Sequence, residues 1–164
     1  MTRSPKAEAK DRTLSNFLCF AVYSANLAVG RAYKPILDAV GLTYTQYIAM
    51  VALSEQGDQT VGALGEKLFL ESNTLTPILK KLEQSGYISR IRDPADERQV
   101  RVSLTAAGRR LLENDPGEAL IEACGLGDEF SVVQKSVIRL RDNLLRNTGR
   151  KQALGNITPP AARP

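Results

Sequence analysis

The chain has 164 residues, of which 43% are hydrophobic and 24% charged, a composition typical of a globular protein with one domain and a sizeable core. Its net charge of +4 is compatible with a nucleic-acid partner, and the absence of histidine removes the commonest metal ligand and general base. No apolar run approaches the roughly 18 residues of a membrane span, and the first residues lack the apolar core of a secretory signal, so we expect a cytoplasmic protein without membrane contact, metal or cofactor.

Two helices are predicted after a disordered segment, residues 1–12. The first helix begins at Thr13, and Gly30 is expected to weaken its end, so that a second short helix covers about residues 31–39 and stops at Gly41. An apolar stripe at helical spacing runs along the first helix and consists of Leu14, Phe17, Leu18, Ala21, Val22 and Ala25. Such a stripe is typical of a helix that buries one side.

The next segment has the pattern of a helix-turn-helix. A capping box of Thr43 and Gln46 opens a helix that ends near Gly57. After a short amphipathic helix and a brief turn, another helix begins with Ser72 at its N-cap and ends at Gly86.

The helix after Ser72 separates apolar from polar side chains. Its core side consists of Leu75, Ile78, Leu79 and Leu82. Its opposite side and flanks, which suit a DNA major groove, carry Ser72, Asn73, Thr74, Thr76, Pro77, Lys80, Lys81 and Gln84. A proline inside the helix deletes one backbone hydrogen bond, so we expect a bend unless the regular helix starts later. A polar face with two lysines is also what an ordinary solvated helix shows, and the next feature decides between the two interpretations.

A β-hairpin is predicted from two strand-like runs, residues 88–92 and 100–104, which enclose a polar tip. In the second run Val100, Val102 and Leu104 point inward, whereas Arg101 and Ser103 point outward. The candidate DNA contacts of this hairpin are Arg92, Asp96 and Arg98. Helix, turn, helix and hairpin together predict a mainly α fold with a small β wing, in which the arginine at the tip suits a minor groove.

Further helices are predicted after the hairpin. Thr105 caps a helix that extends through Leu112, and Pro116-Gly117 interrupts the chain. A short helical piece, residues 118–123, ends at Cys124.

The last long helix runs from about Asp128 to Arg146, and residues 149–164 are expected to form a loose tail. Alternating steps of three and four connect its apolar residues Phe130, Val133, Val137, Leu140 and Leu144. This spacing is typical of helix-on-helix packing, either in an ordinary core or at a dimer seam.

Two runs of residues carry a resemblance to a known family. The run DPADERQVRVSLTAAG, residues 93–108, resembles the wing signature of the MarR family of bacterial transcription regulators. The run TLTPILKKLEQSGYISR, residues 74–90, resembles the recognition helix of the organic-hydroperoxide-responsive, OhrR-like branch. The resemblance covers roughly Leu14 to Leu145.

The resemblance implies a single domain over residues 13–148. Its winged helix-turn-helix would occupy about residues 43–105, and its dimerisation helices about 13–40 and 106–148. The implied protein is a homodimer that binds a pseudo-palindromic operator, and the last helix is then interpreted as part of the dimer seam.

Cys19 gains a possible role only from this resemblance, because a lone cysteine on a helix is most often a small buried hydrophobe. In OhrR-like repressors a cysteine on the first helix senses peroxide and is hydrogen-bonded by two tyrosines. Here these would be Tyr33 and either Tyr23 or Tyr44, from the same chain or from the partner. Tyrosine hydroxyls stabilise the thiolate that attacks the peroxide. Tyr23 and Tyr33 are equally explained as residues packed in an interface.

Cys124 resembles the resolving cysteine of the two-cysteine OhrR-like proteins. The resemblance implies that it forms an intersubunit disulfide with oxidised Cys19, after movement at Gly125 and Gly127, and that this bond releases DNA. The alternative is an exposed or buried thiol without a partner.

The leading interpretation is therefore a non-enzymatic, DNA-binding repressor induced by organic hydroperoxides. A second interpretation keeps the fold and replaces the redox chemistry by release with a small phenolic or aromatic ligand. A third interpretation, a thiol peroxidase, would not explain the recognition helix and the wing.

Overall fold

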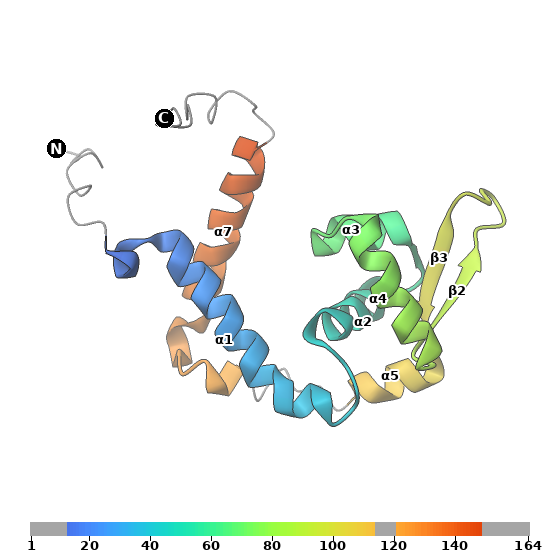
Figure 1. Cartoon of the computed structure of the whole chain (residues 1–164), viewed down its shortest axis with the longest axis horizontal. Helices are drawn as coiled ribbons and strands as arrows, with labels where there is room; N and C mark the ends of the chain where they lie inside the picture. Colours follow the sequence, from blue (N-terminus) through green and yellow to red (C-terminus); the bar gives the residue numbers. More distant parts are fainter. Residues whose placement is uncertain (1–12, 114–120, 149–164) are drawn as a thin grey trace, which may run out of the picture. The chain divides into compact units, whose positions relative to one another are not determined.

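The computed structural model describes residues 13–113 and 121–148 of the chain (Figure 1). The chain divides into two compact units, Met1–Leu120 and Ile121–Pro164. The expectations for residues 1–12 and 149–164 and for the interruption at Pro116-Gly117 lie outside the described residues. None of the helices within the described ranges has the length and apolar composition that a membrane crossing requires.

The first unit confirms the predicted mainly helical architecture with a small β wing. Its elements in chain order are a 3-10 turn (Leu14–Asn16), α1 (Leu18–Asp38), α2 (Tyr44–Gln56), β1 (Gln59–Thr60), α3 (Val61–Leu68), α4 (Ser72–Gln84), β2 (Ile88–Arg92), β3 (Val100–Leu104) and α5 (Ala106–Leu112). Figure 1 shows the hairpin of β2 and β3 projecting beyond α4, so the two form a helix and wing of the predicted kind.

The core of this unit lies where α2, α3 and α4 pack together and against the sheet. Its largest fully buried side chains are Met50, Leu53, Leu64, Leu75, Leu79, Leu82 and Val102. The predicted apolar side of α4 therefore faces the core, because three of its four residues are completely buried and Ile78 is half-buried. Burial of each such side chain contributes roughly 2 kcal/mol, which fixes which side of α4 is left for a partner.

α1 differs from its prediction in two respects. It begins at Leu18, after the 3-10 turn, instead of at Thr13, and it runs through Gly30 to Asp38 without a break. A glycine inside a helix costs about 1 kcal/mol relative to alanine, which weakens a helix but does not end it. The predicted stop at Gly41 is confirmed, since this residue has a φ of +69° in the turn after α1.

The apolar stripe of α1 is exposed in the single chain. Leu14, Phe17, Leu18 and Val22 each have 39–63% of their surface accessible, and only Tyr33 and Leu37 of the helix are buried. The expectation that this helix buries one side is therefore not met within the described part of one chain.

The sheet has three antiparallel strands in the order β1-β3-β2. The two long strands have the predicted bounds, and Ile88 pairs with Leu104 at one end and Arg92 with Val100 at the other. β1 was not predicted, because two residues are too short to show an alternating pattern. It places Thr60 opposite Arg101 and so joins the helix-turn-helix to the hairpin.

The second unit contains one long helix. Residues 121–123 are helical, a 3-10 turn follows at Gly127–Glu129, and α7 runs from Phe130 to Thr148, two residues later than predicted at each end. Most of the apolar seam residues of α7 are exposed, with Val137 half accessible.

Candidate functional site

The polar side of α4 is accessible, as predicted. Its exposed residues are Ser72, Asn73, Thr74, Pro77, Lys80, Lys81 and Gln84, and Thr76 is half-buried. The N-cap is Glu71, and the prediction that Ser72 caps the helix is wrong by one position. Glu71 makes no side-chain capping hydrogen bond, and its carbonyl oxygen accepts the Thr74 amide at 3.0 Å.

Pro77 lies in the sixth position of α4, and the helix continues past it to Gln84. The hydroxyl of Thr76 donates to the carbonyl oxygen of Ser72 at 2.6 Å, which satisfies a carbonyl of the first turn. The helix ends at a left-handed glycine, Gly86 with a φ of +77°, as the sequence predicted.

The tip of the wing, residues 93–99, is held by hydrogen bonds to two aspartates. Asp93 Oδ1 accepts from the Ala95 amide at 2.9 Å, and Asp96 Oδ1 accepts from the Arg98 amide at 3.1 Å. Asp96 Oδ2 also accepts from the Gln99 side chain at 3.0 Å. Asp96 therefore shapes the tip, whereas the exposed Arg98 is presented by it.

A groove of about 410 Å³ lies between the wing and the helix-turn-helix. Its lining residues are Thr60, Val61, Gly62, Ser72, Thr76, Leu79, Arg90, Arg98, Gln99 and Val100. The groove thus brings together three predicted contact residues, Ser72, Thr76 and Arg98. Lys80, Lys81, Gln84, Arg92 and the remaining predicted contacts lie outside this lining, on the exposed surface.

Arg90 lines the same groove and was not predicted. Its guanidinium donates to Glu83 Oε2 at 2.7–2.8 Å, which links β2 to the last turns of α4. Arg90 shares one face of β2 with the buried Ile88, two residues earlier, whereas its neighbours Ser89 and Ile91 are exposed, and this period of two could have identified it.

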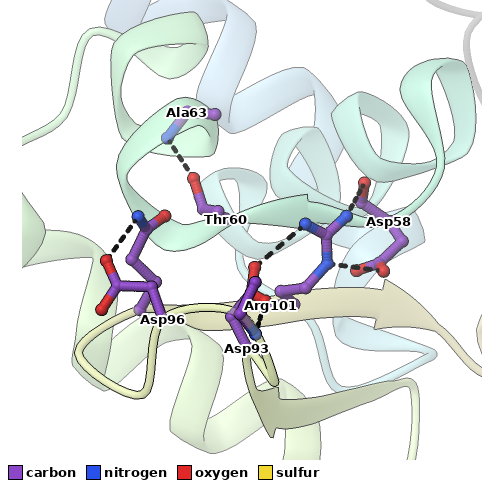
Figure 2. Close-up of polar contacts among 8 residues, drawn as sticks. Asp58, Thr60, Ala63, Asp93, Asp96 and Arg101 are labelled. Atoms are coloured by element: carbon purple, nitrogen blue, oxygen red, sulfur yellow. Dashed lines mark hydrogen bonds and ion pairs between the residues drawn. The ribbon is translucent and has the colours of Figure 1, made fainter.

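Arg101 also has partners that the sequence did not reveal, and it lies half-buried between two aspartates (Figure 2). Nε donates to Asp58 Oδ2 at 2.9 Å, and Nη1 donates to Asp93 Oδ2 at 3.3 Å. The hydrogen bonds that Arg101 donates to Asp58 and then to Asp93 raise the pKa of Arg101. The amide of Ala95, followed by the Arg101 side chain, lowers the pKa of Asp93. Both groups are therefore charged around neutral pH.

Cys19 is an exposed thiol in the first turn of α1, and Tyr23 lies one turn further along the same helix. Tyr23 is 58% exposed, and its ring centroid lies 6.4 Å from that of Phe20. Cys19 is thus accessible to a small reagent in the single chain.

Tyr33 and Tyr44 lie together, at the other end of α1. Their ring centroids are 5.0 Å apart, and the ring of Tyr47 is 5.5 Å from that of Tyr33. Burial raises the pKa of Tyr44, so this hydroxyl keeps its proton. Tyr33 and Cys19 are separated by about four turns of one helix, or about 21 Å along its axis. The Tyr33 hydroxyl of a chain therefore does not reach the thiol of the same chain.

Cys124 is exposed and lies in the turn after residues 121–123. Gly125 and Gly127 follow with φ values of +63° and +48°, a conformation that L-residues with side chains adopt at a cost. The segment thus holds a thiol beside two residues with wide backbone freedom.

A family model described as the transcriptional regulator SarA/Rot matches residues 31–114. The organic hydroperoxide resistance transcriptional regulator of Bacillus subtilis is 40% identical over 134 residues, which cover 80% of this chain and 91% of the relative.

Solved structures of AbfR, a protein of Staphylococcus epidermidis, are also similar. Reduced AbfR bound to DNA superposes with a TM-score of 0.64 and 36% identity, over 80% of this chain and 94% of AbfR. The disulfide form of AbfR superposes with a TM-score of 0.56 and 35% identity, over 81% and 92%.

Proposed function

The chain belongs to the MarR family of transcription regulators, in its organic-hydroperoxide-responsive, OhrR-like branch, and from this premise we propose that it is a dimeric repressor that oxidation of Cys19 releases from DNA. The single domain proposed for this role comprises residues 13–148, with the winged helix-turn-helix at about 43–105. The observation that carries the proposal is the groove in which Ser72, Thr76 and Arg98 meet beside the exposed face of α4.

In the proposed complex α4 enters the major groove of a pseudo-palindromic operator and Arg98 enters the adjacent minor groove. The exposed residues Asn73, Lys80 and Gln84 face the base edges or phosphates, and the uncapped start of α4 suits a phosphate. The two recognition helices of the dimer then lie about 34 Å apart, one duplex turn.

The DNA proposal is tested by the salt dependence of binding to a duplex that the wild-type protein selects from a random pool. Each lost phosphate contact lowers the slope of log K against log salt by about 0.9, so Lys80→Ala and Arg98→Ala should each weaken binding and flatten this slope. Arg110→Ala, which removes the same charge from the exposed surface of α5, is the matched control. Arg98→Ala binding as tightly as wild type would remove the wing from the interface.

Dimerisation is proposed through the exposed apolar residues of α1 and α7. Leu18 and Val22 on α1, Leu14 in the 3-10 turn before it, and Val133 and Val137 on α7 would each lose accessible apolar surface in a dimer. Such surface contributes about 25 cal/mol per Å² on burial, and patches of this kind on a single chain mark interaction sites.

For the sensor, the thiolate of Cys19 attacks an organic hydroperoxide at the outer oxygen. The O–O bond breaks, an alcohol leaves after taking up a proton, and Cys19 becomes a sulfenic acid. Because the same chain's Tyr33 is about 21 Å away along α1, the stabilising hydroxyls are proposed to be Tyr33 and Tyr44 of the partner chain. Tyr23, one turn from Cys19, is the remaining candidate within the chain.

Cys124 is proposed to resolve the sulfenic acid. Its sulfur attacks the sulfur of Cys19 in the partner chain, a disulfide forms and water leaves. The disulfide form of AbfR supports this chemistry in a related protein. The proposed consequence is a shift of the helices that carry the wings, which spoils the half-site spacing and releases DNA.

Non-reducing gel electrophoresis after mild cumene hydroperoxide treatment tests this step. Wild type should run as a covalent dimer, and both Cys19→Ser and Cys124→Ser as monomers. A covalent dimer that persists in Cys124→Ser would show a bond between two Cys19 residues and would overturn the resolving role. Loss of both thiols in a monomer would instead place the bond within one chain.

The second candidate, a regulator released by a small phenolic or aromatic ligand, requires a ligand cavity, and one cavity lies between α1 and α2. This cavity of about 210 Å³ is lined by Gly30, Lys34, Leu37, Asp38, Leu42, Thr43 and Tyr44. Ligand pockets commonly have about 300–1,000 Å³, so the cavity is small for this role. Titration of free thiols against cumene hydroperoxide separates the candidates, because ligand release leaves both thiols intact. The thiol peroxidase interpretation is disfavoured, since the relatives are transcription regulators.

A further inference from the structure

We infer that Arg101 is a positioning residue for DNA binding, which holds the wing at a fixed distance from the helix-turn-helix so that Arg98 meets the minor groove. The inference rests on the proposed DNA-binding function and assigns to Arg101 no contact with DNA of its own.

The geometry of Arg101 is that of a clamp across the whole sheet. The residue lies on the central strand β3, opposite Thr60 of β1 on one side and Ile91 of β2 on the other. Its guanidinium reaches Asp58, which precedes β1, through both Nε and Nη2, the latter to the Asp58 carbonyl oxygen at 3.3 Å. It reaches Asp93, which follows β2, through Nη1 (Figure 2).

Asp93, the partner of Arg101 on the wing side, controls the conformation of the tip of the wing. Asp93 donates its amide to the Gln99 carbonyl oxygen at 2.9 Å and accepts the Asp96 amide on its own carbonyl oxygen at 3.2 Å. Its carboxylate holds the amide of Ala95. Because Asp93 anchors both ends of the tip, whatever fixes Asp93 also fixes the loop that presents Arg98.

Asp58, the other partner of Arg101, lies close in sequence to the start of α3. Asp58 lies two residues before Thr60, whose hydroxyl caps α3 by accepting from the Ala63 amide at 3.1 Å (Figure 2). Residues 60–62 form one wall of the groove and residues 98–100 form another. Arg101 therefore joins the two walls, and the width of the groove depends on its two ion pairs.

Only an arginine can make this connection. Its planar fork directs Nε and one terminal nitrogen to Asp58 and the other to Asp93, whereas the ammonium of a lysine is a point charge without this fixed geometry. Arg101→Lys thus keeps the charge and removes the clamp. The side chain of Arg101 is 32% exposed and that of Asp93 15%, so this pair is largely shielded from water, whereas the side chain of Asp58 is 46% exposed.

The test is a double-mutant cycle with the selected duplex. Arg101→Lys should weaken binding about fivefold in the wild-type background and have no effect in the Arg98→Ala background, because the clamp acts through Arg98. Additive effects would mean that Arg101 contacts DNA itself or acts on the whole fold, and would overturn the inference. Asp58→Asn should reproduce the result of Arg101→Lys.

A second measurement needs no DNA. Amide hydrogen exchange of residues 93–99 should be faster in Arg101→Lys than in wild type, while exchange in α2 and α4 stays the same. Unchanged exchange in the wing would contradict the clamp even if the protein bound no duplex. Failure of wild type to bind any duplex would instead contradict the proposed function, so the two failures are distinguishable.

Discussion

Replacing Tyr33 by phenylalanine in only one chain of the dimer tests which chain supplies the hydroxyl to Cys19. Cys19 and Tyr33 are about 21 Å apart along α1, so a Tyr33 hydroxyl that reaches the thiol would belong to the partner. A hydrogen bond to a charged group contributes about 1.5 kcal/mol or more, equivalent to about tenfold in the population of thiolate. A less stabilised thiolate is also a better nucleophile, with a Brønsted coefficient of about 0.5, so the net loss in oxidation rate is roughly threefold.

Two mixed dimers, each with a single Cys19, separate the alternatives. In the first, a Tyr33→Phe chain is paired with a Cys19→Ser chain, so the remaining thiol meets an intact tyrosine of the partner. In the second, a wild-type chain is paired with a chain that carries both substitutions, so the thiol meets a phenylalanine of the partner. Differently tagged chains, purified in tandem, give each species free of the parent dimers.

The assay is the rate of sulfenic acid formation with cumene hydroperoxide, followed with a sulfenic-acid-specific probe. We expect the first mixed dimer to react at the wild-type rate and the second to react about threefold more slowly. The opposite order would place the hydroxyl in the same chain and refute the reasoning from helix length. Equal rates in both would remove Tyr33 from the site.

Three further predictions concern stability. Leu79→Ala removes a fully buried side chain of α4 and should lower the free energy of unfolding by about 3 kcal/mol in urea denaturation; a loss below about 1 kcal/mol would contradict its place in the core. Gly30→Ala meets no neighbouring atom and should stabilise α1 by about 0.8 kcal/mol, visible as a higher melting temperature, and a lower one would indicate a hidden contact. Asp93→Asn should lower stability above the ordinary carboxyl pKa of 3.8, where the wild-type group is charged. Because the folded pKa lies below 3.8, the difference should shrink as the pH falls below 3.8 and disappear once the carboxyl is protonated in the folded protein, and a difference that does not shrink on acidification would exclude the charge as its cause.

Local signals in the sequence predicted those elements that local chemistry determines. The capping box of Thr43 and Gln46 forms as expected, with the Thr43 amide donating to Gln46 Oε1 at 2.8 Å. The hairpin strands have the predicted bounds because alternation of buried and exposed residues is a property of neighbouring positions.

The remaining features depend on contacts between distant positions. β1 exists because Gln59 and Thr60 pair with a strand some forty residues later, and the partners of Arg101 are likewise on other elements. A break was expected at Gly30, but the unfavourable helix propensity of one glycine is outweighed by the stability of the 21-residue helix around it. The position of the tyrosines could not be predicted either, since only the continuous α1 places Tyr33 four turns from Cys19 and beside Tyr44.

The continuity of α1 has a mechanical consequence. Its 21 residues form one helix of about 31 Å, with the thiol near one end and the buried pair Tyr33 and Leu37 near the other. Because no break in the helix separates its two ends, a tilt imposed at the Cys19 end would be transmitted to the turns that pack against α2. The helix proposed to carry the chemical event would thus also transmit motion to the DNA-binding part, and its weakest points are Gly30 and Pro35.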